Sequence, residues 1–303
     1  MAKPILYVTA AGALLVASAC GAQESAAAGA REAAVSARCE IIERGVPLPR
    51  ALEETSGLAA SRRHAGILWT HNDRGGDPRL YAIGAAGEMR GRVEVRGARA
   101  RDWEDIAIGP CPSGDCVYIA DTGSNRERRE TVTIYRVPEP APDAERTARA
   151  EAFPVRFPGG PQDTEALFVL PTGALYLVTK GESGPVELFR YPPPLRPDEV
   201  VALERVRRIA DAPGGRGGKV TGADASADGA WVAIRTYHEL LLFRTVGLLA
   251  GGREAVRVDL RPLGEEQGEG VAFGTGGEMV LTSEAGGRGR ATLSRLACSL
   301  TGG

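Results

Sequence analysis

Several residue classes are scarce in this sequence, and each shortage excludes a class of protein. Aromatic residues make up 5% of the 303 residues, and 37 basic against 39 acidic side chains give a formal net charge of −2. This balance excludes a duplex nucleic-acid binder, which needs a clear excess of basic residues. The three histidines, His64, His71 and His238, have the spacing of neither a zinc motif nor a catalytic triad.

Motifs for phosphate binding, calcium loops and nucleophilic catalysis are incomplete. The stretch Gly214–Thr221 resembles a phosphate loop, but Val220 follows its lysine where the motif requires Ser or Thr. Asp224–Gly229 begins like a calcium loop, yet Arg235 stands where a bidentate glutamate is needed. Ser183 lies in a sequence that misses the nucleophile elbow by one residue. These failures favour a binding or scaffold protein over an enzyme.

Apolar runs long enough to cross a bilayer are also missing near the start of the chain. Ile5–Val16 is too short to cross, follows Lys3 and precedes the small residues Ala17–Ala19, as in an export signal. Ordinary signal-peptidase cleavage and lipidation of Cys20 in a lipobox-like site are the two alternatives. Lipidation of Cys20 leaves four of the five cysteines for disulfides, which favours the lipoprotein.

The predicted organisation is a signal peptide with lipobox over residues 1–20, a flexible tether over 21–37 and one folded domain over 38–303. The tether is rich in Ala, Gly, Ser and Glu, and no Val, Leu or Ile occurs in it before Val35. This organisation predicts an exported protein on the bacterial cell envelope. It would be a monomer that contacts the membrane through its lipid anchor only.

Glycine and proline, by contrast, are abundant, with 40 Gly and 20 Pro, and they separate the strands of a fivefold repeat. Each repeat is about fifty residues long and has up to four strand-sized segments, which is typical of a β-propeller blade. We therefore predict an all-β, five-bladed propeller, with six blades as the alternative. The five repeats open at Thr55–Ala59, Trp103–Ala107, Thr164–Phe168, Val220–Asp224 and Gly268–Ala272.

The fifth repeat lacks a fourth strand, and a segment before the first repeat can supply it. Cys39–Arg44 alternates like a strand, and propellers are commonly closed by a terminal strand that completes the last blade. Beside Ala291–Leu300, this strand would bring Cys39 next to Cys298. We therefore predict a Cys39–Cys298 disulfide that locks the ring. A second disulfide, Cys111–Cys116, would clip the turn of one hairpin.

The second residue of each opening segment carries a family resemblance. In chain order these five residues are Ser, Glu, Glu, Thr and Glu, which is similar to the Ser, Glu, Glu, Ser, Glu order of the SdiA-regulated lipoprotein-like family of five-bladed β-propellers. The likeness covers about residues 39 to 300. Asp105 and Ala166 depart from it, because they replace the usual glycine. The resemblance implies a propeller but no settled activity; the layout is also similar to calcium-dependent esterase, phytase and nucleotidase propellers. The five residues are Ser56, Glu104, Glu165, Thr221 and Glu269.

These five side chains are predicted to converge on the propeller axis. Three adjacent carboxylates, Glu104, Glu165 and Glu269, cannot all ionise without compensation, because each charge raises the pKa of its neighbours. One interpretation is a Ca²⁺ site, with oxygens of Ser56 and Thr221 or water completing the shell. The other is a structural network in which Lys180, Arg235 or backbone amides neutralise the glutamates.

A mixed-charge rim is predicted at the mouth of the axis, at the ends of the second strands. A rim of this kind could bind a small polar or anionic ligand. We therefore predict an envelope protein that binds a small polar ligand or a protein partner. The alternative is a calcium-dependent phosphoesterase or nucleotidase with Lys180 and Arg235 as its basic pair. The rim residues are Asp73, Asp121, Lys180, Arg235 and Glu284.

Overall fold

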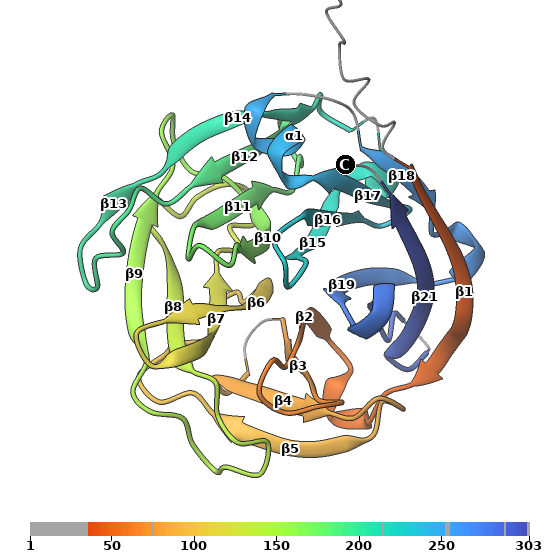
Figure 1. The fold of residues 1–303 in the computed structure, drawn as a ribbon. Helices are drawn as coiled ribbons and strands as arrows, with labels where there is room; N and C mark the ends of the chain where they lie inside the picture. The colour runs from red at the N-terminus through yellow and green to blue at the C-terminus, as the bar shows by residue number, and fades with distance from the viewer. Residues whose placement is uncertain (1–35, 74–75, 214, 252–254, 288, 302–303) are drawn as a thin grey trace, which may run out of the picture. The chain divides into compact units, whose positions relative to one another are not determined.

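The computed structural model describes residues 36–73, 76–213, 215–251, 255–287 and 289–301. The predicted signal peptide, Cys20 and residues 21–35 of the predicted tether lie outside these residues. The described chain forms five sheets, each built on four antiparallel strands, arranged around a central axis (Figure 1). The prediction of a five-bladed, all-β propeller is therefore confirmed, and the six-bladed alternative is wrong.

Each blade contains an innermost, a second, a third and an outer strand. The innermost strands are β2 (Thr55–Ala60), β6 (Asp105–Cys111), β10 (Thr164–Val169), β15 (Val220–Ala225) and β19 (Gln267–Phe273). The second strands are β3 (Leu68–Asn72), β7 (Gly114–Asp121), β11 (Leu175–Thr179), β16 (Trp231–Thr236) and β20 (Glu278–Glu284). The third strands are β4 (Arg79–Ile83), β8 (Val132–Pro138), β12 (Val186–Arg190), β17 (Glu239–Arg244) and β21 (Thr292–Thr301). The outer strands are β5 (Met89–Glu94), β9 (Glu151–Arg156), β14 (Glu204–Ala210), β18 (Val256–Asp259) and β1 (Ser36–Pro47).

The N-terminal strand β1 closes the ring by completing the fifth blade, as predicted. It pairs antiparallel with β21, and Cys39 stands opposite Cys298, to which it is disulfide-bonded. The second predicted disulfide, Cys111–Cys116, is also present. Since β1 begins at Ser36, the last two residues of the predicted tether belong to the sheet. A disulfide that closes so long a loop contributes roughly 5 kcal/mol of stability on the chain-entropy model.

Three connections between third and outer strands cover the outer strand of the preceding blade, and they were not predicted from the sequence. The connection after β8 donates from Thr147 N to Glu94 O of β5, at 2.9 Å. Strand β13 (Val201–Ala202), after β12, pairs parallel with β9. Helix α1 (Thr245–Ala250), after β17, lies over β14 (Figure 1). These contacts protect sheet edges that would otherwise expose unpaired backbone groups.

The apolar core lies in layers between adjacent blades. Along β10, Leu167 and Val169 pack against blade two, whereas Ala166 and Phe168 pack against blade four. This alternation follows from the two-residue period of a strand. Because both faces of each inner strand are covered, every residue of β10 is buried. The layers fix the blades radially, so the first residues of the inner strands meet at the axis.

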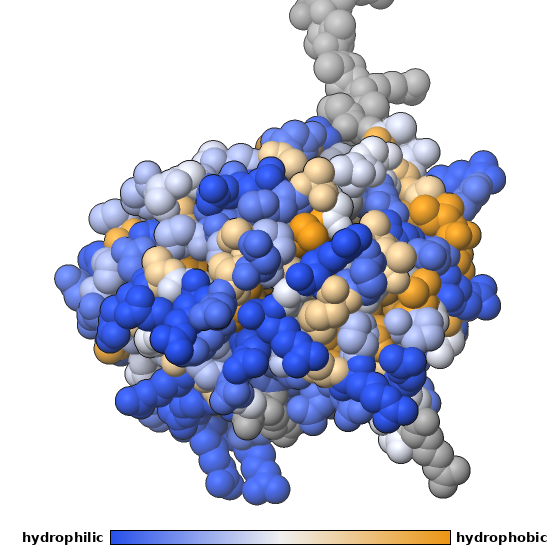
Figure 2. All heavy atoms as spheres, turned by 90° about the horizontal axis from the view of Figure 1, so that it is seen from below, coloured by the Kyte–Doolittle hydropathy of each residue, from blue (hydrophilic) through white to orange (hydrophobic). Residues whose placement is uncertain are grey.

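The outer surface is largely hydrophilic. Seen from the side on which β4 and β5 lie in Figure 1, polar side chains cover most of the surface and apolar ones are scattered (Figure 2). The exposed large apolar side chains are dispersed over different elements, which is ordinary for a folded domain. Among the described residues, no helix has the length and apolar character needed to cross a membrane. The exposed apolar residues are Ile41, Ile42, Val200 and Val246.

Candidate metal centre at the propeller axis

A small polar cavity, here called the axial cavity, lies where the five innermost strands begin. Its volume is about 170 Å³, which is the space of about six water molecules. Every blade contributes to its wall, and most of the lining side chains are carboxylates or amides. The lining residues are Ser56, Asp73, Glu104, Asn125, Glu165, Lys180, Tyr237, Gln267, Glu269 and Glu284.

Irregular strand pairing aims the opening residues toward the axis. In four blades the register between the innermost and the second strand shifts around the second residue of the opening segment. In blade three, for example, the shift lies between Thr164 and Ala166, on either side of Glu165. Such bulges redirect a side chain out of the regular alternation of a strand. The shifts elsewhere lie around Ser56, Thr221 and Glu269.

Ser56 and Thr221, the two hydroxyl residues among the five predicted to converge on the axis, bind the backbone of the next blade. Ser56 Oγ donates to the carbonyl oxygen of Glu104 at 2.6 Å, and Thr221 Oγ1 donates to that of Glu269 at 3.1 Å. Ser56 lines the axial cavity, whereas Thr221 does not. The two hydroxyl groups therefore position Glu104 and Glu269. This role differs from the predicted one, in which they bind a metal ion or a ligand.

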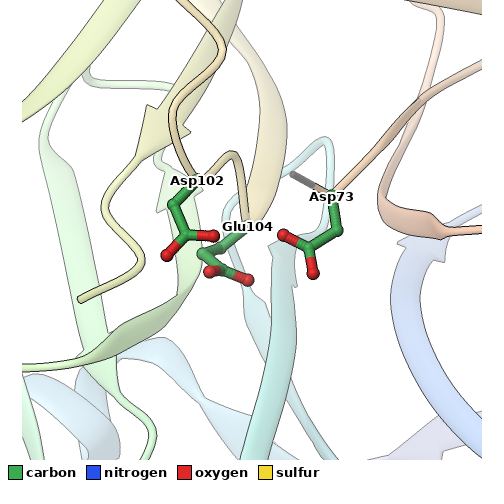
Figure 3. A group of neighbouring side chains, drawn as sticks. All are labelled: Asp73, Asp102 and Glu104. Carbon is green, nitrogen blue, oxygen red and sulfur yellow. The ribbon is translucent and has the colours of Figure 1, made fainter. Parts of the chain in front are cut away.

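Glu104 lies at the centre of the densest group of carboxylates. Its carboxylate oxygen lies within 4.8 Å of those of Asp73 and Asp102, and the three side chains point toward one another (Figure 3). The same distance limit holds for a second group, Glu104 with Asp163 and Glu165. Burial raises the pKa of Glu104 well above its usual range, and the charges of Glu165 and the three aspartates raise it further.

Lys180 neutralises the second group. Its Nζ lies 2.6 Å from Glu165 Oε1 and 3.8 Å from Asp163 Oδ2. Burial raises the pKa of Glu165 to about 7, although the Lys180 charge acts in the opposite direction. Burial favours the neutral amine of Lys180, but the carboxylates of Glu165 and Asp163 outweigh it and raise the lysine pKa. The predicted structural role of Lys180 toward a ring glutamate is therefore present at Glu165.

Glu269 faces the axial cavity from blade five. It is 5% exposed, and burial, followed by the charges of Glu165 and Glu284, raises its pKa well above the usual range. Within the described part of the chain, its carboxylate accepts no hydrogen bond and forms no ion pair. Glu269 is thus a buried carboxyl group without a hydrogen-bond donor among the described residues, next to a cavity.

The predicted rim is only partly assembled. Asp73, Lys180 and Glu284 line the axial cavity, but Asp121 and Arg235 do not. Asp121 is buried and pairs with Arg129 at 2.9 Å. Arg235 is fully buried, pairs with Glu265, and donates from Nη1 to the carbonyl oxygens of Gly270 and Thr282, at 2.8 and 3.0 Å. Both side chains hold structure together instead of facing a ligand.

Asp102 and Asp163 complete the two carboxylate groups and were not predicted from the sequence. Both precede a ring glutamate by two residues, in Asp102-Trp-Glu104 and Asp163-Thr-Glu165. This repeated spacing is the signal that could have identified them. Asn125, Tyr237 and Gln267 were also missed. Of these, only Gln267 carries the same signal, because it stands two residues before Glu269.

Two further carboxylates near the axis are held by backbone N–H groups. Asp105 is fully buried and accepts from Ile106, Leu167 and Ala223, at 2.9, 2.8 and 3.0 Å. It thereby connects blade two with blades three and four. Asp224 accepts from Ala225 and Phe273, both at 2.8 Å, and so connects blade four with blade five.

Comparison with known proteins defines the fold and leaves the chemistry open. No protein-family model and no curated protein sequence matches the chain, so the resemblance to the SdiA-regulated lipoprotein-like family stays a prediction. The PQQ-bound aldose sugar dehydrogenase from Streptomyces coelicolor is 13% identical over 87% of this chain and 99% of that chain, with a TM-score of 0.54. The soluble aldose sugar dehydrogenase from Escherichia coli, in its apo form, is 10% identical over 86% and 99%, with a TM-score of 0.49. Likeness at this level of identity shows a shared β-propeller fold alone.

Proposed function

We propose that the protein is an exported binding propeller that holds a hard divalent cation, Ca²⁺, in the axial cavity at Glu104. One observation carries the proposal. The buried carboxylate of Glu104 belongs to two acidic groups at once, and its raised pKa reflects burial and four neighbouring carboxylates. A bound cation lowers the free energy of this arrangement at neutral pH, because it compensates charges that otherwise repel one another.

We assign the cation to the group formed by Asp73, Asp102 and Glu104, because its three side chains point toward one another (Figure 3). In the other group, Lys180 Nζ lies 2.6 Å from Glu165. Carboxylate oxygens are the ligands that Ca²⁺ prefers, and the ion takes six to eight oxygens. Water or a bound ligand would supply the oxygens that the three carboxylates do not.

A binding role is supported over the alternative of a calcium-dependent phosphoesterase. That alternative relied on Lys180 and Arg235 as a basic pair for phosphate. Arg235 pairs with Glu265 outside the axial cavity, and Lys180 is engaged by Glu165. We expect no hydrolysis of phosphate esters or nucleotides with Ca²⁺ present; Ca²⁺-dependent hydrolysis that Glu165→Gln abolishes would favour the enzyme instead.

The two disulfides support an oxidising compartment outside the cytoplasm. Together with the predicted export signal, this supports a place on the cell envelope. The lipid on Cys20 remains part of the proposal, as do the monomeric state and the absence of a nucleic-acid partner. The ligand in the axial cavity would then be a small polar molecule of the envelope or its surroundings.

Thermal unfolding of the exported chain in chelator and then in Ca²⁺ tests the cation site. At about one hundred times Kd, Ca²⁺ stabilises by about 2.7 kcal/mol, so Tm is expected to rise by roughly 5–10 °C. Glu104→Gln should remove most of this rise. The matched control is Glu187→Gln, a buried glutamate on β12 that pairs with Arg205 away from the axis. An unchanged Tm of the wild-type protein in Ca²⁺ would rule out the site.

A further inference from the structure

The surroundings of Glu269 form a second polar subsite in the axial cavity, distinct from the carboxylates around Glu104. Glu269 is 5% exposed and lines the cavity together with Tyr237, Gln267 and Glu284. In the described ranges its carboxylate has no hydrogen-bond donor. Leaving a buried carboxylate without a donor has a substantial free-energy cost. Its position at a cavity wall therefore suits a donor that arrives with a bound molecule.

The other groups at this subsite do not form a second metal centre. The side chain of Gln267 donates to Glu284, and its carbonyl oxygen accepts from Arg216 Nη2 at 2.7 Å. Among the described residues, Glu269 belongs to neither group of three converging carboxylates. A hard cation that requires six to eight oxygens would therefore find few at Glu269.

The hydroxyl group of a tyrosine completes the subsite. Tyr237 lines the same cavity, and the guanidinium of Arg216 lies over its ring, 4.6 Å from the centroid. The charge of Glu269 is among the influences that raise the pKa of Tyr237, after burial, so the two side chains are electrostatic neighbours. The lining of the cavity is almost wholly polar and a guanidinium already covers the ring, so Tyr237 presents its hydroxyl group to the cavity. A carboxylate beside a hydroxyl oxygen suits an ammonium group, which offers three N–H donors.

We infer that the axial cavity binds a small aminocarboxylate, whose ammonium group Glu269 receives beside Tyr237. This inference rests on the proposed function, because the carboxylate end of the ligand would complete the oxygen shell of the cation at Glu104. The cavity volume of about 170 Å³ limits the ligand to the size of about six water molecules. Glu165 and Lys180 line the same cavity as Glu104 and Glu269.

Calorimetric titration of the exported chain with β-alanine, propionate and propylamine, each with and without Ca²⁺, tests this inference. β-Alanine carries both end groups, propionate lacks the ammonium group and propylamine lacks the carboxylate. We expect β-alanine to bind in Ca²⁺ at least tenfold more tightly than propionate. Equal affinity for β-alanine and propionate would overturn the inference.

Variants separate the role of Glu269 from a general loss of structure. Glu269→Gln should weaken β-alanine at least tenfold and leave Ca²⁺ affinity within about threefold of the wild type. Tyr237→Phe should also weaken β-alanine, because the hydroxyl of Tyr237 is the group that lines the polar cavity. Unchanged β-alanine affinity in Glu269→Gln would contradict the inference.

The outcome also distinguishes this inference from the proposed function. Ca²⁺ binding without β-alanine binding would refute the aminocarboxylate and leave the cation site intact. β-Alanine binding that requires Glu269 but shows no dependence on Ca²⁺ would keep the ammonium subsite and refute the contact between the ligand carboxylate and the cation, whereas an unchanged Tm in Ca²⁺ would refute the cation site itself.

Discussion

The propeller axis contains two sets of buried carboxylates with opposite surroundings. Glu104 and Glu269 line the axial cavity, where other carboxylates are their neighbours. Asp105 and Asp224 accept hydrogen bonds from backbone N–H groups on both of their oxygens. Burial raises the pKa of all four groups. At the two aspartates, hydrogen bonds from backbone N–H groups act in the opposite direction and lower the pKa.

The comparison shows that burial alone does not identify a functional carboxylate. Asp105 and Asp224 are as buried as the glutamates, but their donors come from neighbouring blades, so their oxygens are already used for assembly of the ring. Glu269 lacks a donor, and Glu104 shares its position with other anions. The glutamates therefore have carboxylate oxygens available for a cation or a ligand, whereas the aspartates do not. The following substitutions should separate the two sets.

Asp105→Ala is expected to have the largest effect, a loss of about 4 kcal/mol in the free energy of unfolding. Three backbone N–H groups, on Ile106, Leu167 and Ala223, would lose their acceptor, and each unsatisfied buried donor costs about 1–3 kcal/mol. Urea denaturation measures the loss, with Glu269→Gln as the control from the other set. A loss below about 1 kcal/mol would show that Asp105 does not hold the blades together.

Glu104→Gln should act in the opposite direction when no cation is bound. Because burial and like charges raise the pKa of Glu104, its ionised form destabilises the folded state as pH rises. Replacing the carboxyl group by an uncharged amide should therefore raise the free energy of unfolding at pH 8 in chelator. Thermal unfolding checks the sign, and Glu187→Gln again serves as the control. A lower Tm for Glu104→Gln would place Glu104 in the structural set with Asp105.

The fold was predictable because its signals repeat. The opening segments recur five times, and the alternation of Cys39–Arg44 beside the missing strand identified the closure and its disulfide. The edge-covering segments carry no such repeat. Strand β13 has two residues, and α1 has six, which is too short for an apolar period to stand out from the surrounding sequence.

The site was predictable only where side-chain direction follows from the repeat. Glu104, Glu165 and Glu269 occupy one repeat position, and all three line the axial cavity. Arg235 was placed at the mouth because it lies near the end of a strand, but it points between blades toward Glu265. A shift of one residue in register reverses the direction in which a strand side chain points. At an irregular strand end, sequence spacing does not determine the register to within one residue.

The smallest expected effect concerns Asp224 and the dependence of stability on pH. Burial raises the pKa of Asp224 to about 7, so its favourable contribution is present at acidic pH and is lost as pH rises through about 7. Between pH 6 and 8 this loss amounts to about 1.4 kcal/mol, and Asp224→Asn should remove it from the slope of stability against pH. The absolute stability of the variant will also fall, because one backbone N–H would face the new amide nitrogen.

Urea denaturation at several pH values, in chelator and in Ca²⁺, measures this slope. The axial glutamates also lose stability with rising pH, since the pKa of Glu165 is about 7, but Ca²⁺ should flatten their part of the slope. Asp224 already has backbone donors on both oxygens and does not line the axial cavity, so its part should remain in Ca²⁺. If Ca²⁺ abolished the whole slope of the wild-type protein, the two sets of carboxylates would not be independent, and the distinction between assembly and binding on this axis would fail.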